Sequence, residues 1–412
     1  MNAAPDAERP WSWLQCVAFR VLLLFWLLQF APPSPLTLLP VLPDAIAGFW
    51  SALASRLGGL LGLVVPQHAE SGSGDTMKDW LAALAALLLA LGGAALWSLL
   101  QRRPVRHGKL LDFFQLFLRV VLVQTLLVYG VIKLFGQQFP APGADRLLST
   151  YAESSPMGLM WVFMGASLPY QQFAGAMEML AGLLLIFRRT STLGALLAAG
   201  VMGNVFVLNL CFDVPVKLFS GQLLLMSLFL VSLDAARLLD LLVFNRATQP
   251  ADRSFRFWGE GRWRWLRHAV VTTCMVAGAV DATQAAAGGP GPESPDPITG
   301  AYEVVSSEGL EGLSRFGFTS GDARLFFSDG TTLRLKVALT PREHRVVLSP
   351  RNGEPGLEAN LVREEGPSPG LFTFSGRWQD APVSLRVRAR DLSSPLLLTR
   401  GFHWVNEFPF NR

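Results

Sequence analysis

The sequence predicts an α-helical multi-pass membrane protein that carries an antiparallel β barrel or sandwich at its C-terminal end. First, 51% of the 412 residues are hydrophobic and only 16% are charged, well below the roughly 25% charge of soluble domains. Second, long apolar segments alternate with short basic loops as far as residue 280. Third, beyond residue 298 short runs of alternating polar and apolar residues replace them, which is typical of strands.

The N-terminal region, residues 1–109, is predicted to hold two membrane helices and one helix of ambiguous placement. An uncleaved first helix is expected over residues 12–30, because Gln29-Phe30-Ala31 is a poor signal-cleavage site. Residues 43–65 carry an apolar stripe at helical spacing, which favours an interfacial helix along the outer face over a spanning one. A plain membrane helix follows over residues 80–100, and the basic loop QRRPVRHGK after it is expected in the cytoplasm.

Residues 110–244 are predicted to form a core of four membrane helices. These are expected over about residues 110–136, 171–189, 192–210 and 216–233. Arg188-Arg189 marks a cytoplasmic boundary, whereas the loop 138–170, rich in Pro, Gly and Ser, suits the outer face. A basic cytoplasmic loop and a last membrane helix, at about residues 265–280, are expected within residues 245–284. The basic loops together predict about seven spans in a bacterial inner membrane, with the N-terminus in the cytoplasm and the C-terminus outside.

The tail is predicted to be an extracytoplasmic β domain, residues 298–412, joined by a linker of residues 285–297. About seven or eight strands are expected, among them AYEVVSS, ARLFFS, TTLRLKVAL, HRVVLSP, GLFTFSGRW, VSLRVRAR and PLLLTR. Residues 328–331, Ser-Asp-Gly-Thr, are expected to form a hairpin turn. Because Arg334 and Lys336 alternate with Leu335 and Val337, one face of the sheet should be wet and the other buried.

Glu178 is the most informative polar residue, since it lies near the middle of the apolar stretch 171–189. A charged side chain at bilayer depth costs at least about 2.5–3.5 kcal/mol, so it is expected to face a bundle interior or a wet cavity. Gly175, Glu178 and Gly182 fall on one helical face. A neighbouring helix is therefore expected to approach closely at the glycines, with the acid in that seam. Lys133 and Asn204 are its candidate partners.

Other polar residues in or beside the four core helices extend this candidate site. They are Thr125, Tyr129, Lys133 and Gln137, which recur every four residues on one helical face, and Asn204, Asn209, Asp213, Lys217 and Gln222. Three interpretations are open. The side chains hydrogen-bond one another to hold the bundle; or they bind a quinone-like or other small polar-headed ligand, with Glu178 as proton carrier; or they line an outward-open transport cavity.

Several other functions are not expected. None of the five histidines lies in the interior of a predicted span; the nearest, His268, is at the cytoplasmic edge of the last one and has no second histidine beside it. A membrane haem needs axial His or Met ligands inside the spans, so haem is not predicted. The three cysteines show no CxxC spacing, which leaves a zinc site, a disulfide framework and a dithiol relay without support, and no other metal site is predicted. The basic residues are dispersed over loops, as the positive-inside pattern requires, so no nucleic-acid partner is expected.

Residues 110–242 resemble the DoxX-like membrane family. The resemblance rests on YGVIKLF, GAMEMLAGLLLIFRRT and VMGNVFVLNLCFDVP. That family includes subunits associated with quinol oxidase or thiosulfate:quinone oxidoreductase. The resemblance therefore implies a redox-associated subunit that interacts with quinone or a partner oxidoreductase, with Glu178 as the transferable residue. The added N-terminal helices, last helix and β tail depart from the minimal four-helix form, so a transporter-like protein and a non-catalytic envelope or assembly protein, whose β domain binds a partner, stay open.

Overall fold

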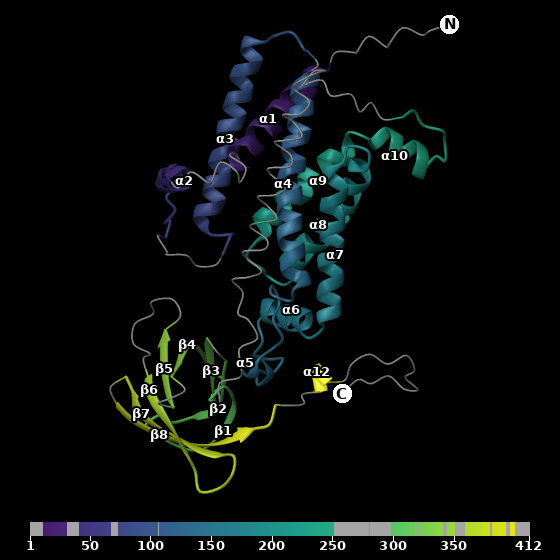
Figure 1. Ribbon diagram of the computed structural model, residues 1–412. Coiled ribbons are helices and arrows are strands. Elements are labelled where there is room, and N and C mark those ends of the chain that lie inside the picture. Colours follow the sequence, from purple (N-terminus) through teal and green to yellow (C-terminus); the bar gives the residue numbers. More distant parts are fainter. Residues whose placement is uncertain are drawn as a thin grey trace. The chain divides into compact units, whose positions relative to one another are not determined.

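The computed structural model divides into two compact units. It describes residues 11–30, 41–66, 73–105, 107–250, 280, 298–319, 321–340, 344–350, 359–379, 381–392 and 396–399. The helical unit comprises residues 1–135 and 173–287, and the barrel unit comprises residues 136–172 and 288–412. Most of the long helices belong to the first unit, and all the described strands belong to the second (Figure 1).

The helical unit is built on long apolar helices. They are α1 (Trp13–Phe30), α2 (Val41–Leu60), α3 (Met77–Leu100), α4 (Gly108–Leu134), most of α7 (Leu168–Ile186), α8 (Ser191–Cys211) and α9 (Lys217–Ser232). The short helix α10 (Ala235–Leu242) follows α9. Phe114, Leu118 and Leu122 of α4 are fully buried in a core shared with α1, α7, α8 and α9. Apart from α2, the predicted helices that fall on described residues have boundaries within about three residues of those observed. Hydrophobic runs of this length have few other ways to satisfy the backbone in lipid.

Several long apolar helices are confirmed, whereas the number of spans stays a prediction. Within the described residues, α1, α3, α4 and α8 are long and apolar enough to cross a membrane. Helices α9 and α10, bent by 72°, make a fifth span if they are counted as one. Neither α2 nor α7 is in this group. In α7 the polar residues Gln171, Gln172 and Glu178 lower the mean hydropathy of the helix. The helix predicted at residues 265–280 and the linker at 285–297 lie outside the described residues, apart from Val280.

Side-chain contacts join the ends of several helices at one end of the helical unit. Trp11, before α1, packs against His107, which precedes α4. Arg188, after α7, binds Asp112 in the first part of α4 at 3.0 Å. Thr192 at the start of α8 donates a hydrogen bond to Asp234 at the end of α9. The segments with basic side chains at residues 102–103, 188–189 and 237 therefore border the same end of the unit.

The tail forms a closed barrel of antiparallel strands in sequence order, which decides between the predicted barrel and sandwich. The strands are β1 (Gly300–Glu308), β2 (Leu313–Phe318), β3 (Asp322–Phe327), β4 (Thr332–Thr340), β5 (Arg345–Pro350), β6 (Ala359–Glu365), β7 (Leu371–Trp378) and β8 (Ala381–Arg390). The rings of Tyr302, Phe316, Phe318 and Phe374 fill its interior. The alternation in β4 is confirmed, because Leu335 and Val337 are buried while Arg334 and Lys336 are exposed.

Two strand predictions need correction. The segment PLLLTR was predicted as a strand, but Leu396–Thr399 forms the short helix α12 instead. The prediction missed β2 and β6, whose sequences LSRFGF and ANLVREE lack a clean period of two. The turn predicted at residues 328–331 is confirmed: it joins β3 to β4, Gly330 has a φ of +88°, and Thr331 N–H donates to Asp329 Oδ1 at 2.8 Å.

The connection between α4 and α7 packs on the barrel. The sequence predicted an irregular outer loop at residues 138–170, and the structure places α5 (Ala144–Leu147) and α6 (Pro156–Gly165) there. Arg315 of β2 binds both carboxylate oxygens of Glu153 at 2.8–2.9 Å, and Arg324 of β3 donates to Ser149 Oγ at 2.7 Å. Because this segment covers β3, both faces of that strand are buried, and Arg324 is only 2% exposed.

Candidate functional site

A buried ion pair between α4 and α7 is the centre of the candidate site. Lys133 Nζ lies 2.8 Å from both Oε1 and Oε2 of Glu178. Lys133 is 7% exposed and Glu178 is 2% exposed. Taking two charges out of water is costly, and the cost is offset only where the ions meet with good geometry. The structure therefore brings Glu178 together with one of its two candidate partners.

Glycines allow the two helices to come close enough for this contact. A Cβ on Gly175 of α7 would lie 2.6 Å from Gly130 O and 2.8 Å from Lys133 Cβ. A Cβ on Gly130 of α4 would lie 2.5 Å from Met179 Cγ. Real Cβ atoms do not approach other atoms so closely, so larger residues at either position would force the helices apart. The predicted close approach is confirmed at Gly175, whereas a Cβ on Gly182 would meet Leu126 and Leu127 at ordinary contact distances of 3.4–3.5 Å.

The other three residues of the predicted polar stripe on α4 have different surroundings. Tyr129 packs against Lys133, with Nζ 5.6 Å from the ring centroid, a geometry that favours a cation over the ring face. Tyr129 is itself 39% exposed, so the residue that contacts the Lys133 ammonium also reaches the surface of the helical unit. Thr125 donates its hydroxyl to Val121 O of its own helix at 3.0 Å. Gln137 lies beyond the end of α4, in the barrel unit.

The remaining predicted site residues lie elsewhere. Asn204 is exposed on α8, and Asn209 is buried and donates its amide to Ser220 Oγ at 3.0 Å. Lys217 binds Asp213 at 2.7 Å, at the start of α9. The backbone N–H groups of Lys217 and Leu218 both donate to the carboxylate of Asp75. Asp213 and Lys217 therefore form part of a helix-terminal cluster rather than a group with Lys133.

Asp75 and two buried arginines of the helical unit, Arg20 and Arg119, were not among the predicted site residues. Arg20 of α1 donates to Ser98 Oγ at 2.7 Å and to Gln101 Oε1 at 3.0 Å, and its guanidinium lies 5.0 Å from the Trp97 ring centroid. It thereby ties α1 to α3. The signal was present, since a charge inside an apolar run costs too much to be left without partners.

Arg119 is the second buried arginine, and it lies in the middle of α4. Its Nε and Nη2 donate to Leu185 O at 2.7 Å and Ile186 O at 2.5 Å, at the last turn of α7. A cation at a helix C-terminus satisfies carbonyls that have no partner within the helix and opposes the negative end of the helix dipole. Arg119 therefore supports the same helix that carries Glu178.

Chemically, the Lys133–Glu178 pair is suited to holding and passing a proton. Ammonium and carboxylate in hydrogen-bond contact exchange a proton over a short distance, and a low-dielectric site makes their charge state sensitive to any new charge nearby. Among the described residues, no group of three His, Cys, Asp or Glu side chains is arranged to hold a metal ion. The two titratable groups of the pair favour acid–base chemistry.

Comparisons with known proteins give a relative but no described activity. The chain is 33% identical over 120 residues to "Uncharacterized protein YwoB" of Bacillus subtilis (strain 168). This similarity covers 28% of the present chain and 73% of the relative. No family model matches the chain. No solved structure matches it.

Proposed function

This chain belongs to the same family as the uncharacterized protein YwoB of Bacillus subtilis, and we propose that it is a DoxX-like, redox-associated subunit of a bacterial inner membrane. In this proposal the chain crosses the membrane about seven times, with its N-terminus in the cytoplasm and its barrel outside. It works with quinone and with a partner oxidoreductase that supplies or removes the electrons. The observation that carries the proposal is the buried ion pair of Lys133 and Glu178.

The chemistry of quinone reduction explains why such a pair is useful. A quinone that accepts electrons develops negative charge on its carbonyl oxygens and must then take up protons. A nearby ammonium both stabilises that charge and donates a proton, because electrostatic interactions are strong in a low-dielectric site. In the proposal Lys133 faces the reduced carbonyl oxygen, and Glu178 carries the replacement proton. Oxidation of a quinol uses the same two groups in the opposite direction.

The position of Tyr129 supports access from the membrane. Its ring contacts the Lys133 ammonium and is also partly exposed at the surface of α4. A lipid-soluble ring compound would reach the pair past this one side chain, without an aqueous channel. An aromatic ring is also a suitable surface on which a flat quinone stacks.

The test is the quinone content and the quinone-dependent behaviour of the purified full-length protein. We expect the wild-type protein to retain extractable quinone, identified by its ultraviolet spectrum before and after borohydride reduction. The Glu178→Gln variant should insert into the membrane but lose quinone-dependent activity or partner association. Asp213→Asn, which removes a carboxylate from the exposed pair with Lys217, is the matched control and should behave as wild type. A Glu178→Gln variant that equals wild type in quinone content, activity and partner association would refute the proposal.

A further inference from the structure

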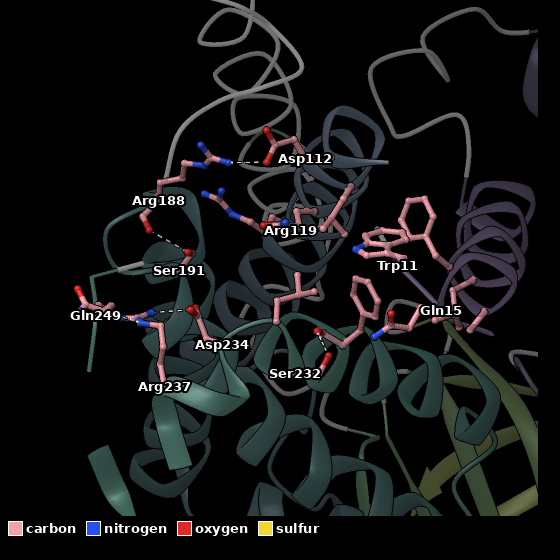
Figure 2. A pocket seen from close by; sticks show the side chains of 18 of the residues that line it. Trp11, Gln15, Asp112, Arg119, Arg188, Ser191, Ser232, Asp234, Arg237 and Gln249 are labelled. Atoms are coloured by element: carbon pink, nitrogen blue, oxygen red, sulfur yellow. Dashed lines mark hydrogen bonds and ion pairs between the residues drawn. The ribbon is translucent and has the colours of Figure 1, made fainter. Parts of the chain in front are cut away.

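A second polar site lies in the helical unit, apart from the Lys133–Glu178 pair. A cavity of about 680 Å³ opens where α1, α4 and α8 begin and α9 ends (Figure 2). Its volume falls within the range of about 300–1,000 Å³ typical of small-molecule sites. Arg119 in its wall precedes Lys133 by 14 residues on α4, which is about 21 Å along a helix axis. The two sites are therefore separate.

The cavity wall is rich in arginine. Arg119, Arg188 and Arg237 line it together with two carboxylates, Asp112 and Asp234, so the five groups carry a formal net charge of +1. Arg188 is paired with Asp112 at 3.0 Å, and Arg237 with Asp234 at 2.6 Å. In the view of Figure 2 the three arginines lie on one side of the cavity. The aspartates hold the guanidinium groups in place without cancelling their total charge.

The opposite side of the cavity is aromatic. Trp11 and Phe19 line it from α1 and the residues before it, with ring centroids 5.0 Å apart in an edge-to-face arrangement, and Phe229 lines it from α9. Figure 2 shows Trp11 and Gln15 across the cavity from Arg188 and Arg237. A ligand that fills this space therefore needs an anionic group at one side and an apolar body at the other.

We propose that this cavity binds the phosphate ester of an anionic phospholipid headgroup. Arginine presents a planar fork of N–H donors that fits phosphate oxygens, and it is less strongly hydrated than an ammonium. Basic pockets between membrane helices at the cytoplasmic side are suited to such headgroups. One excess positive charge matches the single negative charge of phosphatidylglycerol, whereas the ammonium of phosphatidylcholine adds a positive charge. The glycerol and the upper acyl chains then lie along Trp11, Phe19 and Phe229.

The experiment titrates detergent-solubilised, full-length protein with short-chain phosphatidylglycerol and follows thermal unfolding. A ligand that binds only the folded state raises the melting temperature with its concentration. We expect saturable stabilisation by phosphatidylglycerol and little by phosphatidylcholine with the same acyl chains. Equal stabilisation by both lipids would overturn the proposal. Stabilisation by sodium phosphate that phosphatidylglycerol does not increase would assign the cavity to free phosphate and overturn its lipid part.

Two variants with opposite expected effects on the Kd test whether phosphatidylglycerol binds in this cavity. Arg237 has a more exposed side chain than Arg188, and Arg237→Gln should weaken the apparent Kd for phosphatidylglycerol about tenfold, as expected for loss of one charged hydrogen bond. Asp112→Asn removes the carboxylate that pairs with Arg188 and should tighten binding. Arg102→Gln removes a positive charge outside the cavity lining and is the matched control. An unchanged Kd in both cavity variants would refute the site, even if each variant folds normally.

Discussion

Lys133 and Glu178 form their ion pair beside the point where α4 and α7 touch through Gly130 and Gly175. Each charged residue follows one of these glycines by three positions. The close approach lets the lysine side chain reach the carboxylate within the protein, away from lipid. The small residues and the charges are thus one structural unit, and a change to either should affect the other.

A double-mutant cycle should reveal how strongly the pair is coupled. Lys133→Met and Glu178→Met each leave one buried charge without its partner, so each should lower the free energy of unfolding by about 3–5 kcal/mol. The double variant should recover most of that loss, because two apolar side chains of similar length then fill the space. Thermal and denaturant unfolding in detergent measures this. Additive losses in the double variant would show that the two charges do not interact.

Substitution of Gly175 should separate the two helices. A Cβ there would lie 2.6 Å from Gly130 O, and overpacking of this kind costs about 1–3 kcal/mol. Gly175→Ala should therefore lower thermal stability. Gly200→Ala on α8 is the control, because nothing lies within 4 Å of the position that a Cβ would take there and alanine favours a helix by about 0.5–1 kcal/mol. Equal effects of the two substitutions would contradict the close crossing.

The stability of the helical unit should fall in mild acid through His107. Partial burial and the nearby Arg20 guanidinium hold the pKa of His107 below its ordinary value. The unfolded chain then binds more protons between that lowered pKa and about 6.5. This contribution to stability is therefore complete above about pH 6.5 and decreases as the pH falls through the lowered pKa. Melting temperatures from about pH 8 to pH 5 should show this decline in the wild type and a smaller one in His107→Gln; parallel curves would argue against it.

The packing of the α4–α7 connection on the barrel should depend on the charges of Arg315 and Glu153. A hydrogen bond from Thr150 N–H, together with the Arg315 guanidinium, lowers the pKa of the Glu153 carboxyl. Arg315→Glu should repel Glu153 and raise the rate of limited proteolysis in this connection. Arg315→Glu with Glu153→Arg should restore protection. A double variant that is cut as fast as the single one would show that the ion pair does not hold the segment.

Much of the site was accessible from sequence because its determinants are local. The helical face shared by Gly175, Glu178 and Gly182 follows from the period of the helix alone. The choice between Lys133 and Asn204 as partner of Glu178 did not follow, since it depends on which neighbouring helix packs against that face. The roles of Arg119 and of the segment that packs on β3 were not predicted for a related reason. Arg119 contacts Leu185, which is 66 positions away in the chain, and Arg324 contacts Ser149, which is 175 positions away.

Hydropathy determined by itself where the long apolar helices lie, because apolar length acts on each segment independently of its neighbours. Alternation of side chains likewise determined that the tail is a β domain. Only the tertiary structure decided that the sheet closes into a barrel, that residues 136–172 pack with it, and that Glu178 pairs with Lys133. These outcomes depend on strand closure and on contacts between distant segments, which no local pattern records.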